Sequence, residues 1–353
     1  MYSTLVNNIN YLKFIKVMNY KGFIGIDISK KTLDVVALMQ GSRKGEHKQF
    51  TNTQKGFKNL LSWVINITGQ KGEQLLFCME HTGVYAYKLS CFLSDRNLSF
   101  CLENPLQIKR SMGINRIKND KADAQMIARY AMRHQEDLSL YKLPTKAIIK
   151  LKHLLVYRDR LIKSKHAFRV SFKELSKHTN KEDSNFISNE SKSLINVLNK
   201  RIKKVELEIE NLIKSEESLK KNYILMMSVG GVGKITASHM LVYTNNFVSF
   251  ANSRQFACYS GIAPFEHSSG ISLKGRTRIS SLANKKMKGL LSIGACSAIQ
   301  HDNELRNYYN KKIEQGKPPL SVLNVIKNKI VSRVFAVIKR GTPYVSIVNY
   351  NTF

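Results

Sequence analysis

The first 140 residues alternate between two patterns of apolar positions. Two apolar runs flank the polar tetrad SKKT at 29–32, an arrangement that predicts a β-hairpin. Apolar residues then recur at steps of three and four over 57–67, which predicts a helix. The same two patterns predict further elements: strands at 75–80 and 99–104, and helices at 85–94 and 119–135. Strands and helices mixed in this way indicate an α/β domain, which we place at 21–144.

The pattern changes after residue 144. Over 145–222 the chain holds few glycines, many Lys and Glu, and apolar residues on one helical stripe. This predicts a long helical hairpin or coiled coil, broken at the polar stretch HTNKEDSNFISNES. Glycine returns over 223–345, which we expect to be a separate, mostly helical domain. Residues 1–20 are expected to be an extension, with the true start at Met1 or Met18, and residues 346–353 a tail.

Lysine and arginine outnumber aspartate and glutamate by 57 to 25, so the formal charge is +32. A protein so far from neutrality repels itself unless an anionic partner binds, and nucleic acid is the expected partner. The abundance of Lys, Asn and Ile is also typical of AT-rich genomes. That bias enriches Asp and Glu as well, so it does not explain the excess of positive charge.

The five cysteines are scattered, with no CxxC pair and no neighbouring histidine cluster. A zinc ribbon or a disulfide framework is therefore not expected, in agreement with a reducing cytoplasm. The first 20 residues lack a signal-peptide pattern, and no apolar run approaches the roughly 18 residues of a membrane helix. We expect a cytoplasmic protein without a membrane partner.

Carboxylates are scarce in this chain, so their positions are informative. Asp27 lies inside the apolar run FIGIDI, Glu80 ends LLFCME, and Asp120 and Asp123 lie three residues apart at a helix start. A buried carboxylate within a strand is costly unless it is paired or binds a cation. Two Mg²⁺ ions about 4 Å apart, held by such a cluster, activate a nucleophile and stabilise a leaving oxygen in phosphodiester cleavage.

Two of these residues also have a simpler explanation. Asp120 could cap the helix, and Asp123 could form a surface pair with Lys118 or Lys121. Asp27 has no obvious structural task, because isoleucine flanks it on both sides.

The segment SVGGVGK at 228–234 matches a phosphate-binding loop only in part, because its first position and the residue after its lysine do not fit. We expect a tight glycine turn between two helices, as in helix-hairpin-helix modules. Gly231 and Gly233 would then expose backbone N–H groups to one DNA phosphate, with Lys234 beside them. The alternative is a plain helix-to-helix turn.

Residues 265–281 are rich in Ser, Gly and basic side chains and have no apolar periodicity. We expect a loop or short turns here. Loops on a rigid scaffold often carry function.

Three segments of the α/β domain together resemble a known family. GIDISKKTLDVVAL, MEHTGVYAY and KNDKADAQMIARYA, in this order, are similar to the RuvC-like, RNase H-fold domain of the DEDD transposases. These enzymes occur in bridge-RNA-guided insertion sequences, and the pilin-gene invertase is related to them. In the family a D, E, D, D tetrad binds one or two Mg²⁺ ions. The matching positions are Asp27, Glu80, Asp120 and Asp123.

The C-terminal region resembles the transposase domain of the same family. The family pattern runs G-aliphatic-A-P, then S-G, then R-I-S-K-x-G-N. Here GIAP lies at 261–264, SG at 269–270 and RIS at 278–280. Members use the serine of the S-G step as a nucleophile on DNA phosphorus, which implies Ser269, with Ser268 as the alternative.

The chain departs from the family after R-I-S, because SLAN at 281–284 lacks the usual lysine and glycine. Lys274, Lys285 or Lys286 could supply the missing phosphate contact. If none does, this copy binds DNA but reacts poorly. Arg276 and Arg278 are expected to hold flanking phosphates.

The resemblance implies a recombinase of donor and target DNA with a covalent 5′-phosphoserine intermediate. A serine hydroxyl needs activation by a base or a metal, so the carboxylate site and Ser269 would form one composite active site. In the guided branch of the family, a noncoding bridge RNA pairs with both DNAs. We expect a nucleoid-associated prokaryotic homo-oligomer, a dimer or dimer of dimers, joined through 145–222. The alternative for that segment is a solvated spacer.

Two other functions remain possible on the sequence alone. A RuvC-like structure-specific nuclease would keep the four carboxylates and have no use for Ser269. A non-catalytic architectural protein would bind DNA without Mg²⁺, with steep salt dependence and no strand breakage.

Overall fold

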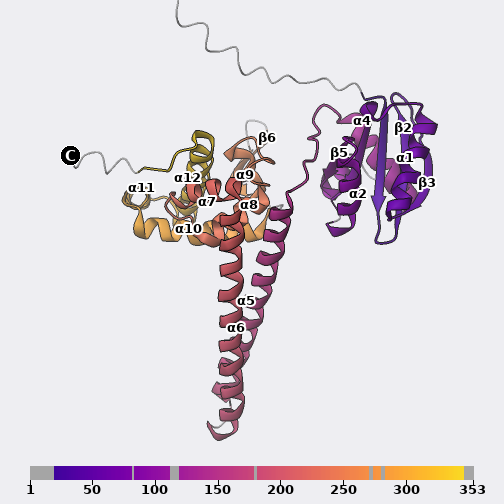
Figure 1. The fold of residues 1–353 in the computed structure, drawn as a ribbon. Coiled ribbons are helices and arrows are strands. Elements are labelled where there is room, and N and C mark those ends of the chain that lie inside the picture. Colours follow the sequence, from indigo (N-terminus) through magenta and orange to yellow (C-terminus); the bar gives the residue numbers. More distant parts are fainter. Residues whose placement is uncertain are drawn as a thin grey trace, which may run out of the picture. The chain divides into compact units, whose positions relative to one another are not determined.

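A computed structural model describes residues 20–81, 83–111, 119–178, 181–269, 273–279 and 283–345, without the side chains of 172–184 and 266–282. The chain divides into two compact units, Met1–Leu143 and Pro144–Phe353 (Figure 1). The predicted tail at 346–353 and all but the last residue of the predicted extension at 1–20 lie outside the described residues.

The first unit is built on a five-stranded sheet with strand order β3-β2-β1-β4-β5. Its strands are β1 Gly22–Ile28, β2 Thr32–Met39, β3 Glu46–Thr51, β4 Leu75–Glu80 and β5 Ser99–Glu103. Strand β1 pairs antiparallel with β2 and parallel with β4, while β3 and β5 are the outer strands. The predicted hairpin is confirmed. Strand β3 is not predicted from the sequence, because this largely exposed strand has no apolar alternation.

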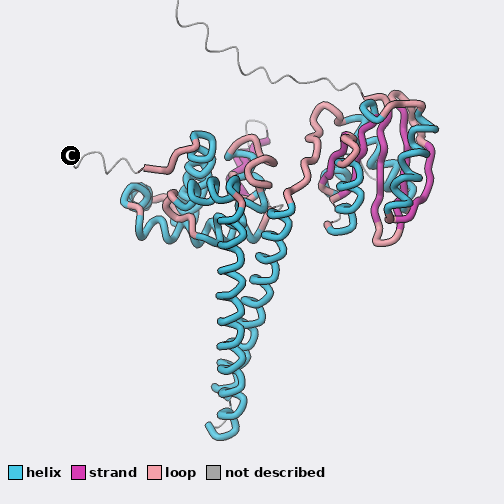
Figure 2. The backbone as a smooth tube through the Cα atoms, viewed as in Figure 1, coloured by secondary structure: helices cyan, strands magenta, loops and turns pink. Residues whose placement is uncertain are grey.

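Helices cover both faces of this sheet (Figures 1 and 2). The described helices of the unit are α1 Gln54–Thr68, the short 3₁₀ helix Gly72–Gln74, α2 Val84–Ser94, α3 Pro105–Ser111 and α4 Asp120–Arg133. One core joins Ile24 and Ile26 of β1 to α1 and α2. A second core joins Phe23 of β1 to α4. Because strand residues alternate between faces, Asp27 belongs to the α4 face.

The second unit begins with two long helices that run side by side, α5 Lys146–His178 and α6 Lys181–Ser215 (Figure 1). We call this pair the helical arm. The predicted break is shorter than expected, since α6 already begins at Lys181 and takes up most of the polar stretch. Of the described helices, none is long and apolar enough to cross a membrane.

The rest of this unit is mostly helical. Its elements are α7 Glu217–Met227, α8 Lys234–Tyr243, α9 Ser253–Tyr259, β6 Pro264–Ser269, β7 Leu273–Ile279, α10 Lys285–His301, α11 Asn303–Glu314 and α12 Pro319–Arg340. The expectation of a loop at 265–281 is wrong, because β6 and β7 pair antiparallel. These strands carry too few apolar residues to reveal a strand by alternation.

One hydrophobic core runs through the second unit. It contains Leu151 and Ile209 of the arm together with Met240, Leu291 and Ile330 from the helices that follow. The predicted boundary at 222/223 therefore falls within α7, inside a shared core. The boundary predicted at 144/145 lies one residue from the division between the units.

Candidate active site

Four carboxylates lie on neighbouring strands at one end of the sheet. Asp27 on β1 is directly opposite Asp34 on β2, and Glu80 on β4 is directly opposite Glu103 on β5. Ile26 pairs with Met79, so Asp27 and Glu80 are the next positions along β1 and β4. Opposed residues of paired strands point to the same face. All four side chains therefore belong to the α4 face.

Helix α4 adds two aspartates to this face. Asp120 and Asp123 lie in its first turn. The helix is capped by Asn119, whose Oδ1 accepts a hydrogen bond from the Ala122 backbone N–H at 2.7 Å. The explanation of Asp120 as the cap is therefore wrong. Among the described residues, no ion pair joins Asp123 to Lys121, and Lys118 lies outside them.

Gly25 allows α4 to approach the sheet closely. A Cβ atom on Gly25 would lie 2.2 Å from the Ala124 carbonyl oxygen and 2.3 Å from the Ala128 nitrogen. Only a residue without a side chain permits this approach. The first turn of α4, with its two aspartates, is thus held against the strand that carries Asp27. This role was not predicted from the sequence, although a lone glycine inside an apolar strand is a known indication of close backbone approach.

The carboxylates perturb one another electrostatically. The pKa of Asp27 is raised to about 6, chiefly by burial and then by the charges of Glu80, Asp123, Asp120 and Asp34, in that order. The pKa of Glu80 is also raised, first by burial, while Lys109 acts in the opposite direction. In the described part of the chain, no ion pair or hydrogen bond neutralises the Asp27 side chain. The four predicted carboxylates therefore provide a negative site, in which Lys109 offsets part of the charge of Glu80.

The two outer carboxylates have partners of their own. Asp34 is 6% exposed, and its two oxygens lie 3.0 Å from His47 Nε2 and 3.0 Å from Gln49 Nε2. Burial raises the pKa of Glu103, and a hydrogen bond with Tyr130 partly offsets this. Neither acid was predicted from the sequence, although Asp34 lies in an apolar strand as Asp27 does.

The chemistry of this donor set suits Mg²⁺, which prefers carboxylate oxygens. The geometry does not amount to a coordination site, since no group of three or more His, Cys, Asp or Glu side chains in the described residues is placed to hold a metal ion. The structure places the four predicted residues on one face of the sheet. The coordination itself stays a prediction.

The two candidate nucleophiles lie at the end of β6. In the backbone register, Ser268 is opposite Lys274 and Ser269 is opposite Leu273. Ser269 is therefore the last residue of β6, next to the connection to β7. The predicted phosphate-binding arginines, Arg276 and Arg278, belong to β7.

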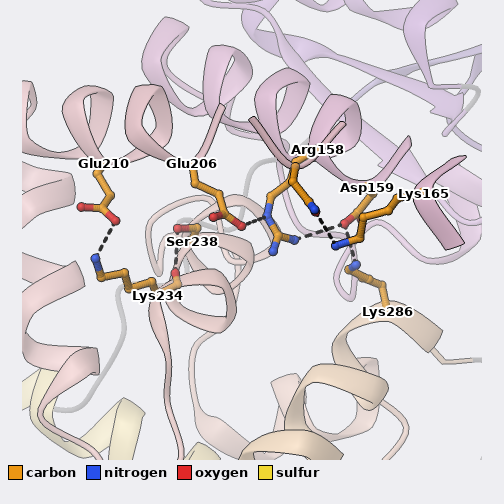
Figure 3. Close-up of polar contacts among 9 residues, drawn as sticks. Arg158, Asp159, Lys165, Glu206, Glu210, Lys234, Ser238 and Lys286 are labelled. Carbon is orange, nitrogen blue, oxygen red and sulfur yellow. Dashed lines mark hydrogen bonds and ion pairs between the residues drawn. The ribbon is translucent and has the colours of Figure 1, made fainter. Parts of the chain in front are cut away.

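The glycine turn lies between α7 and α8, as predicted. Gly231 has φ +87°, and a Cβ there would lie 2.5 Å from the Gly294 carbonyl oxygen of α10. This close packing explains Gly231 without a DNA phosphate. A Cβ on Gly233 would meet nothing within 4 Å. The Lys234 ammonium lies 2.6 Å from Glu210 Oε1 of the arm (Figure 3).

The lysines after the hairpin differ in their surroundings. Lys285 and Lys286 are the first residues of α10. The Lys286 ammonium lies 2.7 Å from Asp159 Oδ1 of α5 (Figure 3). Lys285 is exposed, and no described residue forms an ion pair with it. Of the two, Lys285 is the one available to a phosphate.

Comparison with known protein families gives two matches, which together cover parts of both units. One family model, described as "Transposase" of the DEDD type, matches residues 24–177. A second, the "Transposase IS116/IS110/IS902 family", matches residues 223–310. Together they span more than half of the chain. The first covers Asp27, Glu80, Asp120 and Asp123, and the second covers the hairpin of β6 and β7, which we call the serine hairpin because it contains Ser268 and Ser269.

Two proteins with sequence similarity cover nearly the whole chain. A pilin gene-inverting protein of Moraxella bovis is 29% identical over 328 residues, which is 92% of this chain and 98% of that protein. That of Moraxella lacunata is equally similar. A transposase for insertion sequence element IS1111A from Coxiella burnetii is 26% identical over 60% of this chain and 62% of that protein. The chain belongs to the IS110/IS116 family of transposases.

Proposed function

We propose that this chain cuts and exchanges DNA strands in a Mg²⁺-dependent reaction that passes through a 5′-phosphoserine intermediate. The observation that carries this proposal is the acidic cluster of Asp27, Glu80, Asp120 and Asp123 on one face of the sheet, in which Asp27 has no ion-pair or hydrogen-bond partner among the described residues. A transposase that binds polyanionic DNA has no use for such a site unless cations fill it.

The proposed roles follow from the chemistry of each group. Asp27, Glu80, Asp120 and Asp123 would hold Mg²⁺, which activates a nucleophile and stabilises a leaving oxygen when it is bound. Ser269 Oγ would form a bond to the DNA phosphorus while the bond from phosphorus to the 3′ oxygen breaks. The serine proton passes to solvent and the 3′ oxygen takes one up. A 3′-hydroxyl of the exchanged strand then attacks the phosphoserine and frees the serine.

The basic surface would hold nucleic acid through its backbone. Lys274, Arg276, Arg278 and Lys285 are the proposed phosphate contacts near Ser269, and Gly233 offers an open turn. Such contacts position DNA without reading its sequence. Choice of donor and target would then come from a bridge RNA, whose charge the excess of 57 basic over 25 acidic residues also accommodates.

The helical arm would join subunits. The part of the arm farthest from the shared core exposes large apolar side chains, including Phe186 at 75% and Ile187 at 46%. A groove there is lined by Phe168, Phe186, Ile187 and Leu194. Apolar surface of this kind favours an interface over a solvated spacer. The proposed partner is a second copy of the chain, in a dimer or a dimer of dimers.

A covalent-adduct assay tests the proposal. Purified protein is incubated with Mg²⁺, the RNA of its element and labelled donor DNA, and SDS-resistant protein–DNA adducts are measured. We expect an adduct for the wild type and for Ser268→Ala, and none for Ser269→Ala or Asp27→Asn. The adduct should map by mass spectrometry to the peptide with Ser269.

Other results would replace the proposal. An adduct that survives Ser269→Ala and disappears with Ser268→Ala moves the nucleophile by one residue. Metal-dependent cutting without any adduct favours the RuvC-like nuclease. Salt-sensitive binding without strand breakage favours the architectural protein.

A further inference from the structure

A chain of ion pairs connects the helical arm to the first turn of α10. Arg158 Nε lies 2.7 Å from Glu206 Oε1, which joins α5 to α6. An Arg158 Nη atom lies 3.8 Å from Asp159 Oδ1, and the same oxygen lies 2.7 Å from Lys286 Nζ. Figure 3 shows these side chains pointing toward one another. The contacts join three helices through residues up to 127 positions apart.

These pairs lie in a packed part of the second unit. The side chains of Arg158 and Asp159 are 13% and 22% exposed, whereas another pair of the arm, Lys150 with Glu208, is 56% and 47% exposed. His239 of α8 lies close by and is 4% exposed. Burial lowers the pKa of His239 to about 4, so the imidazole is neutral and adds no charge to the chain of pairs.

The other end of the connection reaches the serine hairpin. Asn284 directly precedes α10, and its Oδ1 accepts from the Met287 N–H at 2.9 Å. Its backbone N–H donates to the Tyr259 carbonyl at 2.9 Å, and its Nδ2 donates to the Tyr259 hydroxyl at 2.8 Å. Tyr259 ends α9, so these bonds tie together the two ends of the segment that contains β6 and β7.

The position of Lys286 is unfavourable for α10 itself. A lysine in the first helical turn is repelled by the positive end of the helix dipole. Asp159 supplies the anion that offsets this repulsion, from a different helix. Partly buried ion pairs contribute little net stability, and their best-supported role is to select one arrangement. The pair therefore favours one register of α10 against the arm, in addition to the packing of the shared core.

We propose that Asp159 and Lys286 are positioning residues, which couple the helical arm to the hairpin that carries Ser269. The proposal rests on the proposed role of Ser269 as the nucleophile. Through Lys286 and Asn284, the arrangement of the arm would set where the hairpin starts and ends. When the helical arms of two subunits associate in the correct assembly, this coupling would place Ser269 for attack on the DNA phosphate.

A charge exchange tests the coupling. Lys286→Glu places two carboxylates against each other, and the double variant Asp159→Lys with Lys286→Glu restores a pair of opposite charges. Lys285→Glu is the matched control for a lost phosphate contact, because it makes the same change at the exposed neighbouring position. Lys150→Glu is the control for breaking an exposed pair of the arm.

Two quantities are measured in the full-length protein: the single-turnover rate of adduct formation with DNA in excess of its Kd, and hydrogen exchange of the backbone amides of β6 and β7. Lys286→Glu is expected to lower the rate by about 10- to 100-fold, as for a displacement of roughly 1 Å, and to speed exchange in the hairpin. The double variant should recover to within about threefold in both measurements, since the paired sites are coupled. Lys150→Glu should change neither.

Several outcomes would overturn the proposal. The coupling is refuted if the double variant does not recover, or if hairpin exchange is the same in Lys286→Glu and the wild type. If Lys286→Glu and Lys285→Glu both only weaken DNA binding, Lys286 is a phosphate contact. If the wild type forms no adduct, the role of Ser269 fails, and hydrogen exchange alone then decides whether the arm and the hairpin are coupled.

Discussion

Replacing Gly25 with alanine tests whether the close approach of α4 sets the carboxylate site. The added Cβ would lie 2.2 Å from the Ala124 carbonyl oxygen and 2.3 Å from the Ala128 nitrogen. Both atoms belong to the backbone of α4, so no side-chain rotation relieves the contact. The helix must move away from β1, and it carries Asp120 and Asp123 with it.

The size of the displacement follows from these distances. Van der Waals contact begins at about 3.5 Å, so α4 must shift by roughly 1 Å. Overpacking of this kind costs about 1–3 kcal/mol of stability, which corresponds to a fall in Tm of a few degrees to about 10 °C. A shift of 1 Å in catalytic groups costs about 100-fold in rate. We therefore expect a folded protein with greatly reduced cleavage.

The assay measures DNA cleavage against Mg²⁺ concentration at a temperature below the Tm of every variant. Gly72→Ala is the control in the same unit, because its Cβ would meet only the end of the flexible Leu98 side chain, at 2.6 Å. Gly25→Ala should need more Mg²⁺ and cut about 100-fold more slowly, while Gly72→Ala behaves as the wild type. If Gly25→Ala cuts at the wild-type rate with the same Mg²⁺ dependence, the position of α4 does not set the site.

Three further predictions concern charge and packing. Asp27→Asn should raise the Tm of metal-free protein at pH 8 but not at pH 3. The pKa of Asp27 is raised to about 6 in the folded chain, against 3.8 for a free carboxyl, so the group takes up a proton on folding between these pH values, and stability is lost as the pH rises from 3.8 to about 6; an unchanged pH profile would contradict this. His47→Ala should destabilise the chain by about 1–3 kcal/mol in urea, because Asp34 is left buried with one partner fewer. Gly231→Ala should lower the Tm, since its φ is +87° and α10 is too close, whereas Gly233→Ala should leave the Tm unchanged; equal effects would refute the packing role.

Local patterns were sufficient for most of the first unit. The hairpin of β1 and β2 and the strand β4 are legible as short apolar runs bounded by polar residues, and the helix α4 by apolar residues at helical spacing. The strands β3, β6 and β7 have little apolar alternation, so no local pattern identified them. The shared core of the arm and the later helices was missed for another reason, since packing between segments far apart leaves no periodic trace.

The sequence by itself determined which acids are chemically unusual. Asp27, Glu80, Asp120 and Asp123 are recognisable because they occupy strand ends, apolar strands or a helix start. Tertiary structure decided what surrounds them. The cross-strand register brings in Asp34 and Glu103, and Gly25 brings α4 close enough for the charges to interact.

The same division holds for the basic residues of the second unit. The sequence showed that Lys234 and Lys286 are positively charged and near the candidate DNA-binding segments. Only the fold revealed that Glu210 and Asp159 already pair with them, 24 and 127 residues away along the chain. The spacing of apolar residues within one segment is enough to predict a helix or a strand, because it depends only on residues close together in the chain. An ion pair depends on which helices pack together, and that is decided by the core as a whole.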